Sequence, residues 1–190
     1  MLVSIIITNY NYGNYLHRCI RSCLNQTLPV NEFEVILVDD FSKDNSHNVV
    51  EEYRSLPNFR YIRNKKNLGV AHSANTAIKK SKGKYFVRVD SDDYINKEFA
   101  NILSLYLREN PKKLGVACDY YLINDEEKKI RQVSSKEKPI ACGIMYNKKK
   151  LLREGLYNIK FKHREEEELR CRLGERYKIH NLSLPLYRYR

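Results

Sequence analysis

The sequence is short of several residue types, and each shortage excludes a class of protein. It contains no tryptophan, two methionines and five prolines among 190 residues. No apolar run approaches the roughly 20 residues that a membrane-spanning helix needs, so we expect no transmembrane segment. A strand pattern begins at Val3 and no basic leader precedes it, so we expect no secretion signal. Low-complexity tracts are absent and 42% of the residues are hydrophobic, a composition typical of a folded globular chain.

Cysteine is scarce and poorly spaced for cross-linking. The five cysteines are odd in number and include no Cys-x-x-Cys pair, so the sequence predicts neither a disulfide framework nor a thiolate zinc site. Cys19 and Cys23 lie four residues apart on a predicted helix, where they could form a ligand pair. We interpret them as two small buried hydrophobes. A cytoplasmic, reducing location fits this cysteine usage best.

Acidic residues are outnumbered, with 23 Asp and Glu against 35 Lys and Arg and a net charge of +12. Such an excess suits a nucleic acid, an anionic membrane surface or a phosphorylated substrate. We expect no nucleic-acid partner, because basic and aromatic residues interleave only at Tyr187–Arg190. The basic, amphipathic stretch Lys148–Tyr157 is consistent with peripheral contact to an anionic membrane, and equally with packing in the core.

What the sequence does contain is an alternation of strand-like and helix-like segments over its first two thirds. A chain of 190 residues is the size of one domain. The alternation predicts an α/β fold, in which helices flank a central, mostly parallel sheet. We expect strands at 3–8, 33–38, 59–62, 84–89 and 114–122, and helices within 13–28, 49–54, 70–80 and 97–108. The later segments predict strands at 128–133 and 140–146, helices at 148–153 and 164–173, and an edge strand at 177–179.

Polar side chains follow three of the predicted strands at the point where each strand ends. In open α/β sheets, ligands bind outside the carboxyl ends of the strands. The three polar segments are Thr8-Asn9-Tyr10, Asp39-Asp40 and Asp90-Ser91-Asp92-Asp93. We therefore expect side chains that are far apart in the sequence to converge on one rim of the sheet.

Asp90 and Asp92 are spaced i, i+2, which points both carboxylates to the same side of an extended segment. Carboxylate oxygens so placed suit Mg²⁺ or Mn²⁺, which would bind through one or two carboxylates and the phosphates of a substrate. The alternative is a solvated acidic turn that caps the helix beginning near Lys97. Because the pair follows a buried strand in a basic protein, we favour the metal site.

Taken in order, these segments resemble glycosyltransferase family 2. The resemblance is carried by Val3–Asn11, Gln26-Thr27, Glu34–Ser42, Asn67-Leu68-Gly69, Asn75 and Val89–Asp93. It continues with Glu165–Leu173, which is similar to the family's Glu-Asp-x-x-Leu-x-x-Arg helix, and with the closing segment Pro185–Arg190. It implies a GT-A (Rossmann-like) single domain, with 1–122 as the nucleotide-sugar-binding half and 123–190 as the acceptor-side half.

The resemblance also implies an activity and individual residue roles. The activity is inverting transfer of a sugar, of the hexosyl type, from a nucleotide-diphosphate sugar to a hydroxyl acceptor, usually with a divalent metal. Thr8, Asn9 and Tyr10 match nucleotide-contacting positions, with Tyr10 offering an aromatic face to the base. Asp40 matches the acid that accepts a hydrogen bond from a pyrimidine N–H, and this favours a UDP-sugar.

The remaining donor-site positions follow in the same way. Asp92 matches the metal ligand that bridges to the diphosphate, and Asp90 would meet the ribose or donor sugar and share the metal. Asp93 would support the loop or the sugar hydroxyls. The segment that lines the donor pocket in the family is matched by Asn67, Gly69 and Asn75.

Single-displacement transfer needs a general base to take the proton of the acceptor hydroxyl. Family members commonly use the Asp of Glu-Asp, where this chain has Glu166 within a run of four glutamates. On a helix, Glu166 lies about 40° from the direction of Leu169 and Leu173, and Glu165 about 60°. We therefore expect Glu166 to face inward and to be the base, with Glu165 as the open alternative.

Histidine contributes one further candidate. The five histidines form no metal-binding cluster. His163 lies three residues before Glu166, so it could approach the acceptor or the diphosphate.

The sequence thus predicts a UDP-sugar glycosyltransferase that uses Mn²⁺ or Mg²⁺ and acts on a glycan or lipid-linked acceptor. The setting of similar proteins is the synthesis of cell-envelope polysaccharide, lipopolysaccharide or glycolipid. We expect a cytoplasmic protein, with peripheral association at the inner face of the membrane and a homodimer as open possibilities. The alternative is a non-catalytic or partner-dependent glycosyltransferase-like module.

Overall fold

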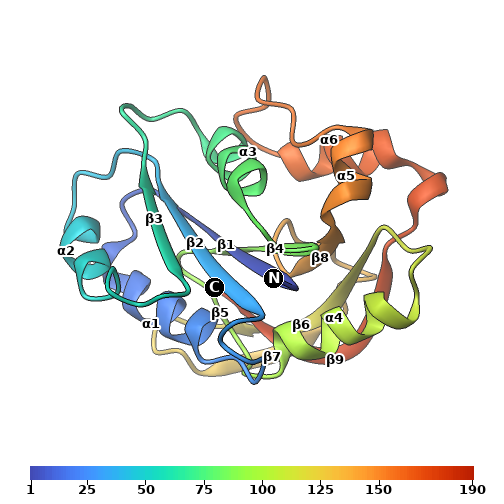
Figure 1. The fold of residues 1–190 in the computed structure, drawn as a ribbon. Coiled ribbons are helices and arrows are strands. Elements are labelled where there is room, and N and C mark those ends of the chain that lie inside the picture. The colour runs from blue at the N-terminus through green and yellow to red at the C-terminus, as the bar shows by residue number, and fades with distance from the viewer.

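Nine strands form one sheet between two layers of helices in the computed structural model, which describes residues 1–190 (Figure 1). The strand order is β3-β2-β1-β4-β8-β6-β9-β5, and β7 pairs with β6 outside this path. The strands are β1 (Val3–Asn9), β2 (Phe33–Asp39), β3 (Phe59–Arg63), β4 (Tyr85–Asp90), β5 (Tyr94–Ile95), β6 (Gly115–Ile123), β7 (Lys129–Val133), β8 (Ile144–Asn147) and β9 (His180–Tyr189). The helices are α1 (Gly13–Leu24), α2 (Ser46–Glu51), α3 (Val70–Lys80), α4 (Phe99–Glu109), α5 (Lys148–Glu154) and α6 (Glu165–Leu173), with a 3₁₀ turn at Glu175–Tyr177.

The register of the parallel strands β3, β2, β1 and β4 brings their carboxyl ends together. Every residue of β1 and β2 is buried, which matches their unbroken apolar sequences. Asn9 at the end of β1 pairs with Asp39 at the end of β2. On the other side of β1, Thr8 pairs with Asp90 at the end of β4. The predicted α/β fold with a mixed, mostly parallel sheet is confirmed, and so is the convergence of the three polar segments.

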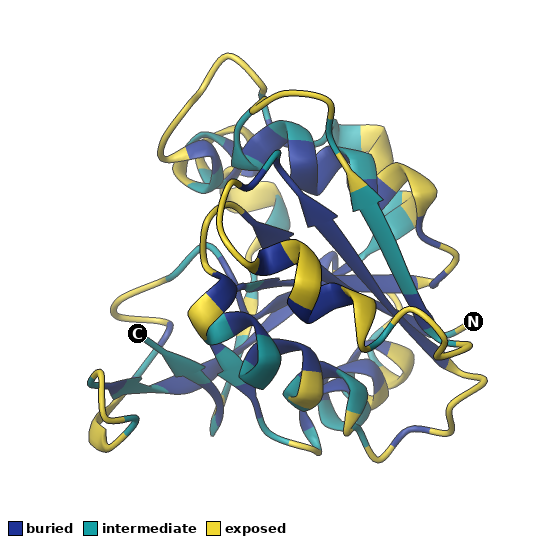
Figure 2. Ribbon diagram, turned by 90° about the vertical axis from the view of Figure 1, so that its left-hand side faces the viewer, coloured by how far each residue is buried: buried dark blue, intermediate teal, exposed yellow.

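The alternation of side chains along the strands divides the core into two clusters, one on each face of the sheet. Ile5 and Ile7 of β1 face α1, α2 and α4, whereas Ile6 faces α3, α5 and α6. The central strands β1 and β2 are accordingly buried along their whole length between the helices (Figure 2). Cys19 and Cys23 lie in the first cluster, where both are fully buried, as small hydrophobes would be.

The closing part of the chain differs most from the prediction. Instead of an edge strand at 177–179, the ten-residue strand β9 lies inside the sheet between β6 and β5. Pro185 argues against a strand in the sequence because it has no N–H for the ladder. The structure accommodates it where the β6–β9 register shifts on both sides of Asp119. The two-residue strand β5 was not predicted, and it pairs with the end of β9.

The amphipathic stretch after β8 places two of its apolar side chains in the core. Leu151 and Tyr157 are buried in the cluster beneath α3 and α6, which favours the packing interpretation for these two side chains. Leu152 stays 45% exposed. None of the helices combines the length and the apolar character that crossing a bilayer would require.

Candidate functional site

A cavity of about 800 Å³ opens at the carboxyl ends of β1, β2 and β4. We call it the edge cavity. It is bounded by the ends of these strands, by the first residues of α3 and by the segment before α6. The lining residues are Thr8, Asn9, Tyr10, Tyr12, Asp40, Asn67, Leu68, Gly69, Val70, Ser73, Arg88, Asp90, Ser91, Asp92, Lys162 and His163.

Most of the residues predicted to bind the nucleotide sugar do line this cavity. Thr8 and Tyr10 come from the end of β1, and Tyr10 is 44% exposed, so its ring is free to meet a ligand. Asn67 and Gly69 lie on the loop that precedes α3. The structure thus gathers side chains from four separate stretches of sequence, although their individual contacts to a ligand stay predictions.

Asp40 holds the loop of residues 64–69 against the edge cavity. Its Oδ1 atom accepts hydrogen bonds from Asn64 Nδ2 at 2.7 Å and from the backbone N–H of Leu68 at 2.9 Å. Its Oδ2 atom accepts from the backbone N–H of Gly69 at 2.7 Å, at the start of α3. An anion at a helix N-terminus is favoured by the helix dipole. Asp40 therefore shapes the wall of the cavity, and its hydrogen bond to a pyrimidine stays a prediction.

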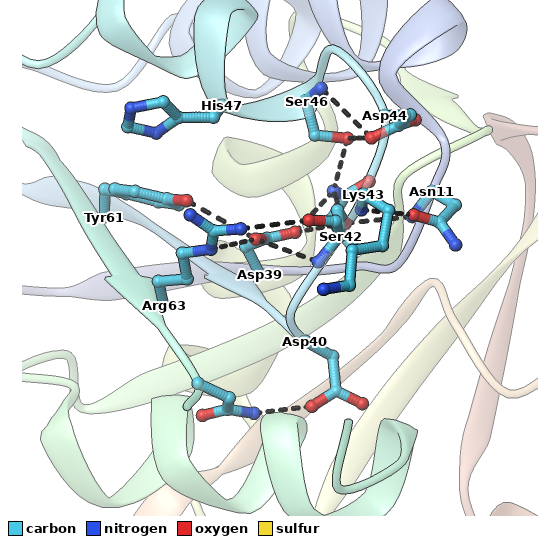
Figure 3. A network of polar contacts seen from close by, with 12 residues as sticks. Asn11, Asp39, Asp40, Ser42, Lys43, Asp44, Ser46, His47, Tyr61 and Arg63 are labelled. Atoms are coloured by element: carbon cyan, nitrogen blue, oxygen red, sulfur yellow. Dashed lines mark hydrogen bonds and ion pairs between the residues drawn. The ribbon is translucent and has the colours of Figure 1, made fainter. Parts of the chain in front are cut away.

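Asp39, by contrast, points away from the edge cavity into a network of polar side chains (Figure 3). Its carboxylate accepts hydrogen bonds from Asn9 Nδ2 at 3.0 Å and from the Ser42 hydroxyl, and forms an ion pair with Arg63 Nε at 3.3 Å. The Asn9 nitrogen also reaches Ser46 Oγ at 2.9 Å. This side-chain nitrogen is thus engaged in anchoring the loop after β2 rather than free for a ligand.

The loop Asp90–Asp93, called the acidic loop below, presents one carboxylate to the edge cavity without an ion-pair partner. That carboxylate belongs to Asp92, which is partly buried. Burial raises the pKa of Asp92, and the nearby Asp90 carboxylate raises it further. Such crowding of like charges in a partly desolvated site favours a bound cation.

Asp93 was expected in the donor site, and the structure places it behind the cavity instead. Its carboxylate is 2% exposed and accepts hydrogen bonds from the Tyr187 hydroxyl at 2.7 Å and from the Arg190 backbone N–H at 2.9 Å. Burial raises the pKa of Asp93 well above its usual range, and Asp90 adds to the shift. Asp93 fastens the acidic loop to the end of β9, which agrees with the expected loop-supporting role and not with a contact to the sugar.

Asn75 is a second displaced prediction. Its side chain is buried and does not line the edge cavity. The side-chain nitrogen donates to the carbonyl of Tyr157 at 2.7 Å, and its oxygen accepts from the Tyr157 N–H at 3.1 Å. Asn75 faces the chain that follows α5 and lies about one and a half turns into α3, beyond the first residues of the helix that line the cavity.

The expectation that Glu166 faces inward is wrong, because Glu165 occupies the interior position. Glu165 is 3% exposed and its Oε1 accepts a hydrogen bond from Arg88 Nη1 at 2.7 Å, whereas Glu166 is partly exposed. The two glutamates differ by only about 20° in their angle to the apolar direction of α6. A helical projection takes no account of charged partners on other elements. Here the guanidinium of Arg88 binds Glu165, and Glu165 is therefore the glutamate that turns inward.

Five residues of the cavity lining lie outside the segments that the sequence singled out: Tyr12, Val70, Ser73, Arg88 and Lys162. Arg88 carried a signal, since an arginine inside the apolar run of a buried strand needs a carboxylate partner. Lys162 lies beside His163, which the sequence did single out and which lines the cavity as expected. The positive charge of Lys162 reaches the cavity from the segment before α6, where no spacing pattern marks it.

The side chains of the acidic loop fit a hard divalent cation, with Asp92 as the unpaired ligand. Asp90, Asp93 and Cys142 also place one ligand atom each within 4.8 Å of one another. A thiol and a buried carboxyl that holds a tyrosine are poor ligands for Mg²⁺ or Mn²⁺, which prefer oxygen and keep several waters. The oxygen ligands that face the cavity, Asp92 and Asp90, fit the ion better.

The sheet order and the edge cavity together define an α/β fold of the GT-A type. The carboxyl ends of the parallel strands line a cavity of about 800 Å³, and the Asp-x-Asp loop lines one side of it. The chain belongs to glycosyltransferase family 2: the family model described as Glycosyl transferase family 2 matches residues 4–171, well over half of the sequence.

Two curated relatives show which proteins this chain is similar to. It is 40% identical over 115 residues to the poly(ribitol-phosphate) beta-N-acetylglucosaminyltransferase TarP of Staphylococcus aureus, covering 59% of this chain and 35% of that protein. It is 38% identical over 120 residues to the chondroitin synthase of Escherichia coli, covering 63% of this chain and 17% of that protein. The matched regions thus span about a third or less of these relatives.

Solved structures agree with the fold. The S. aureus TarS 1-349 structure in complex with UDP-GlcNAc superposes with a TM-score of 0.85 at 24% identity, covering 99% of this chain and 58% of that one. The mannosyltransferase PcManGT from Pyrobaculum calidifontis, in complex with GDP-Man and Mn2+, gives a TM-score of 0.77 at 18% identity, covering 98% of this chain and 56% of that one. At these identities the likeness shows the shared GT-A fold.

Proposed function

We propose that this protein is an inverting glycosyltransferase that moves a sugar from a UDP-sugar to a hydroxyl of a glycan or lipid-linked acceptor. The observation that carries the proposal is the edge cavity, where an aromatic ring, a loop held by Asp40 and an Asp-x-Asp loop face one another. TarP is named as an N-acetylglucosaminyltransferase, and TarS is described in complex with UDP-GlcNAc. UDP-GlcNAc is therefore the first donor to test.

The donor would lie across the cavity from β1 toward the acidic loop. The exposed ring of Tyr10 offers a stacking surface for the base. Lys162 and His163 line the cavity from the segment before α6, where the positive charge of Lys162 would attract the diphosphate. This placement puts the anomeric carbon of the sugar near the acidic loop and the start of α6.

The residues that would hold a divalent metal are Asp92 and, with it, Asp90. A bound Mn²⁺ or Mg²⁺ supplies charge neutralisation for the diphosphate as the nucleotide leaves. Asp92 is suited to this task because no arginine forms an ion pair with its carboxylate, in contrast to Asp90, and the nearby Arg190 offsets only part of the rise in its pKa. Binding a cation would relieve the repulsion that raises the pKa of Asp92.

Glu166 remains the proposed general base. It is the residue at the family's Asp position, and it is partly exposed at the start of α6, where an acceptor can approach. The neighbouring Glu165 is less suited, because its carboxylate is buried and already accepts a hydrogen bond from Arg88. Inversion follows if the acceptor oxygen attacks the anomeric carbon from the side opposite the diphosphate.

The names of the relatives bear on the acceptor and on the cellular role. The relatives act, by their names, on poly(ribitol-phosphate) or in chondroitin synthesis. We propose a role in cell-envelope polysaccharide, lipopolysaccharide or glycolipid synthesis, in the cytoplasm and with peripheral contact to the membrane. Residues 123–190 would then supply the acceptor-side half.

The test is donor hydrolysis, which needs no knowledge of the acceptor. Purified protein is incubated with UDP-GlcNAc and Mn²⁺, and release of UDP and the anomeric form of the freed sugar are followed by NMR. The proposal predicts UDP release with the β-anomer as the first product from the α-linked donor. Release of the α-anomer would contradict inversion, and binding without any turnover, with or without acceptor oligosaccharides, would support the non-catalytic alternative.

A further inference from the structure

Arg88 is the one charged side chain of β4 before the last residue of the strand, Asp90, and it is 5% exposed. Its neighbours in the strand, Val87 and Val89, face the opposite side of the sheet and are completely buried. Placing a guanidinium there is costly unless carboxylates surround it. The chain supplies two of them, from parts of the sequence more than 70 residues apart.

The first partner is Asp90, two residues along the same strand. Arg88 Nε donates to Asp90 Oδ1 at 2.9 Å, and Nη2 donates to Oδ2 at 3.3 Å. This two-point contact fixes the plane of the carboxylate as well as its position. It also engages both oxygens of Asp90 with a positive charge, which lowers their attraction for a metal ion.

The second partner is Glu165, the first residue of α6. Arg88 Nη1 donates to Glu165 Oε1 at 2.7 Å, and both side chains are at least 95% buried. No side-chain cap closes the N-terminus of α6, where Arg164 has a left-handed conformation with φ of 60°. The contact with Arg88 is therefore what ties the start of α6 to the donor-site strand, one residue before Glu166.

We propose that Arg88 is a positioning residue that couples the acidic loop to α6, weakening the hold of Asp90 on the metal and fixing the start of α6, one residue before Glu166. This inference rests on the proposed function. It assigns direct metal binding chiefly to Asp92, with Asp90 oriented by the guanidinium. The distance between the donor and Glu166 then depends on the buried contacts of Arg88 with Asp90 and Glu165.

The test uses a double variant, Arg88→Gln with Glu165→Gln, because removal of Arg88 alone would leave Glu165 buried without a partner. Mn²⁺ affinity is measured by electron paramagnetic resonance without nucleotide, and kcat and KM are measured for UDP release from UDP-GlcNAc. The double variant removes one positive and one negative charge, so the net charge of the site is unchanged. Because both oxygens of Asp90 lose the adjacent guanidinium, we expect Mn²⁺ to bind about tenfold more tightly. We expect kcat to fall about a hundredfold while KM changes little, because the base is no longer held in place.

Two further variants keep the result interpretable. Arg88→Lys retains the charge but not the two-point contact, so Mn²⁺ affinity should stay near the wild-type value while kcat falls. The matched control removes an exposed pair at the end of α2, Arg54→Gln with Glu51→Gln, whose 3.0 Å ion pair includes no residue of the cavity lining. This control should match wild type in both measurements.

A purely structural role would lower stability without tightening Mn²⁺ binding. Wild-type values of Mn²⁺ affinity and kcat in the double variant would therefore overturn the role of Arg88. If the double variant does not fold, Arg88→Lys decides alone, and unchanged kcat in that variant overturns the proposal. Wild-type protein that neither binds Mn²⁺ nor releases UDP contradicts the proposed function, and this inference with it.

Discussion

The two ends of the parallel sheet both bury carboxylates, and they treat them in opposite ways. At the amino end, the Glu34 carboxylate accepts hydrogen bonds from Ser4 Oγ at 2.7 Å, from the Lys82 N–H at 2.6 Å and from Arg60 Nη1 at 3.1 Å. Burial alone would raise the pKa of Glu34, but these three donors outweigh it and lower the pKa. At the carboxyl end, burial and the proximity of Asp90 raise the pKa of Asp92.

The difference separates a structural site from a binding site. Glu34 is complete, because every part of its charge is matched by groups of the chain itself. Asp92 is incomplete, because its charge is crowded by Asp90 and is matched by no arginine ion pair. An incomplete, partly buried charge beside a cavity is what a site for a cationic ligand requires. Substitutions at the two ends should therefore affect different properties.

The largest effect is expected from Asp92→Asn. We expect loss of Mn²⁺ binding and of metal-dependent UDP binding, because the unpaired ligand of the site is removed. The free energy of unfolding should stay the same or rise, since folding no longer confines a crowded carboxylate. Calorimetry and urea unfolding measure the two quantities, with Asp125→Asn, 93% exposed, as the control. Wild-type metal binding in Asp92→Asn would remove the contrast between the two ends.

Glu166→Gln should cost the next most. Loss of a general base lowers kcat by about 10²–10⁴-fold, and we expect this drop with unchanged UDP affinity. Glu165→Gln should instead reduce stability more than Glu166→Gln does, because Arg88 loses a buried partner. Steady-state kinetics and thermal unfolding of both variants decide between them. Activity that survives in Glu166→Gln and vanishes in Glu165→Gln would assign the base to Glu165.

Glu34→Gln tests the amino end and should change stability without changing binding. We expect a loss of about 1–3 kcal/mol at pH 7, because the charge-assisted hydrogen bonds to the carboxylate weaken. The pKa of Glu34 is lowered on folding, so its contribution is present above the unfolded-state pKa of about 4.3 and disappears as the pH falls through the folded-state value. Wild type and variant should therefore converge in acid.

Urea unfolding between pH 3 and pH 7 measures that convergence, and UDP titration measures binding. Glu126→Gln, with a side chain 69% exposed, is the matched control and should leave both unchanged. A difference between wild type and Glu34→Gln that grows as the pH falls would show that the carboxylate is not stabilised by its neighbours.

Tyr10→Ala should have the smallest of the four effects. Loss of one stacking surface weakens nucleotide binding by roughly tenfold, within the range known for base stacking. Tyr10→Phe should retain wild-type UDP affinity because the ring, 44% exposed at the cavity, is kept. Fluorescence or calorimetric titration with UDP measures both variants. Equal weakening in Tyr10→Phe would mean that the hydroxyl, and not the ring, meets the ligand.

Much of the fold could be predicted because its signals are local. The apolar strands β1 and β2 and the periodic helix α3 agree with their predicted ranges to within one residue. β9 could not be predicted, because Pro185 is tolerated only where a register shift in a distant partner strand makes room for it. A pattern read along one segment contains no information about such a partner.

The site shows the same limit. Thr8, Asp40 and Asp92 were predictable because a parallel sheet aligns the ends of its strands. Glu165 was misplaced because its direction depends on Arg88, 77 residues away in the sequence. The prediction for Asn75 failed for the same reason, since its side chain is oriented by the backbone of Tyr157 beyond α5. Predictions failed where a side chain is oriented by one distant polar contact.

We propose that the carboxyl end of the sheet is a donor site completed by a metal ion. Calorimetric titration of UDP, dTDP and GDP into the wild-type protein, with Mn²⁺ and then with a chelator, tests it most directly. We expect UDP to bind in the presence of Mn²⁺ and its binding to be lost with the chelator. Failure of all three nucleotides to bind, or UDP binding that the chelator leaves unchanged, would contradict it.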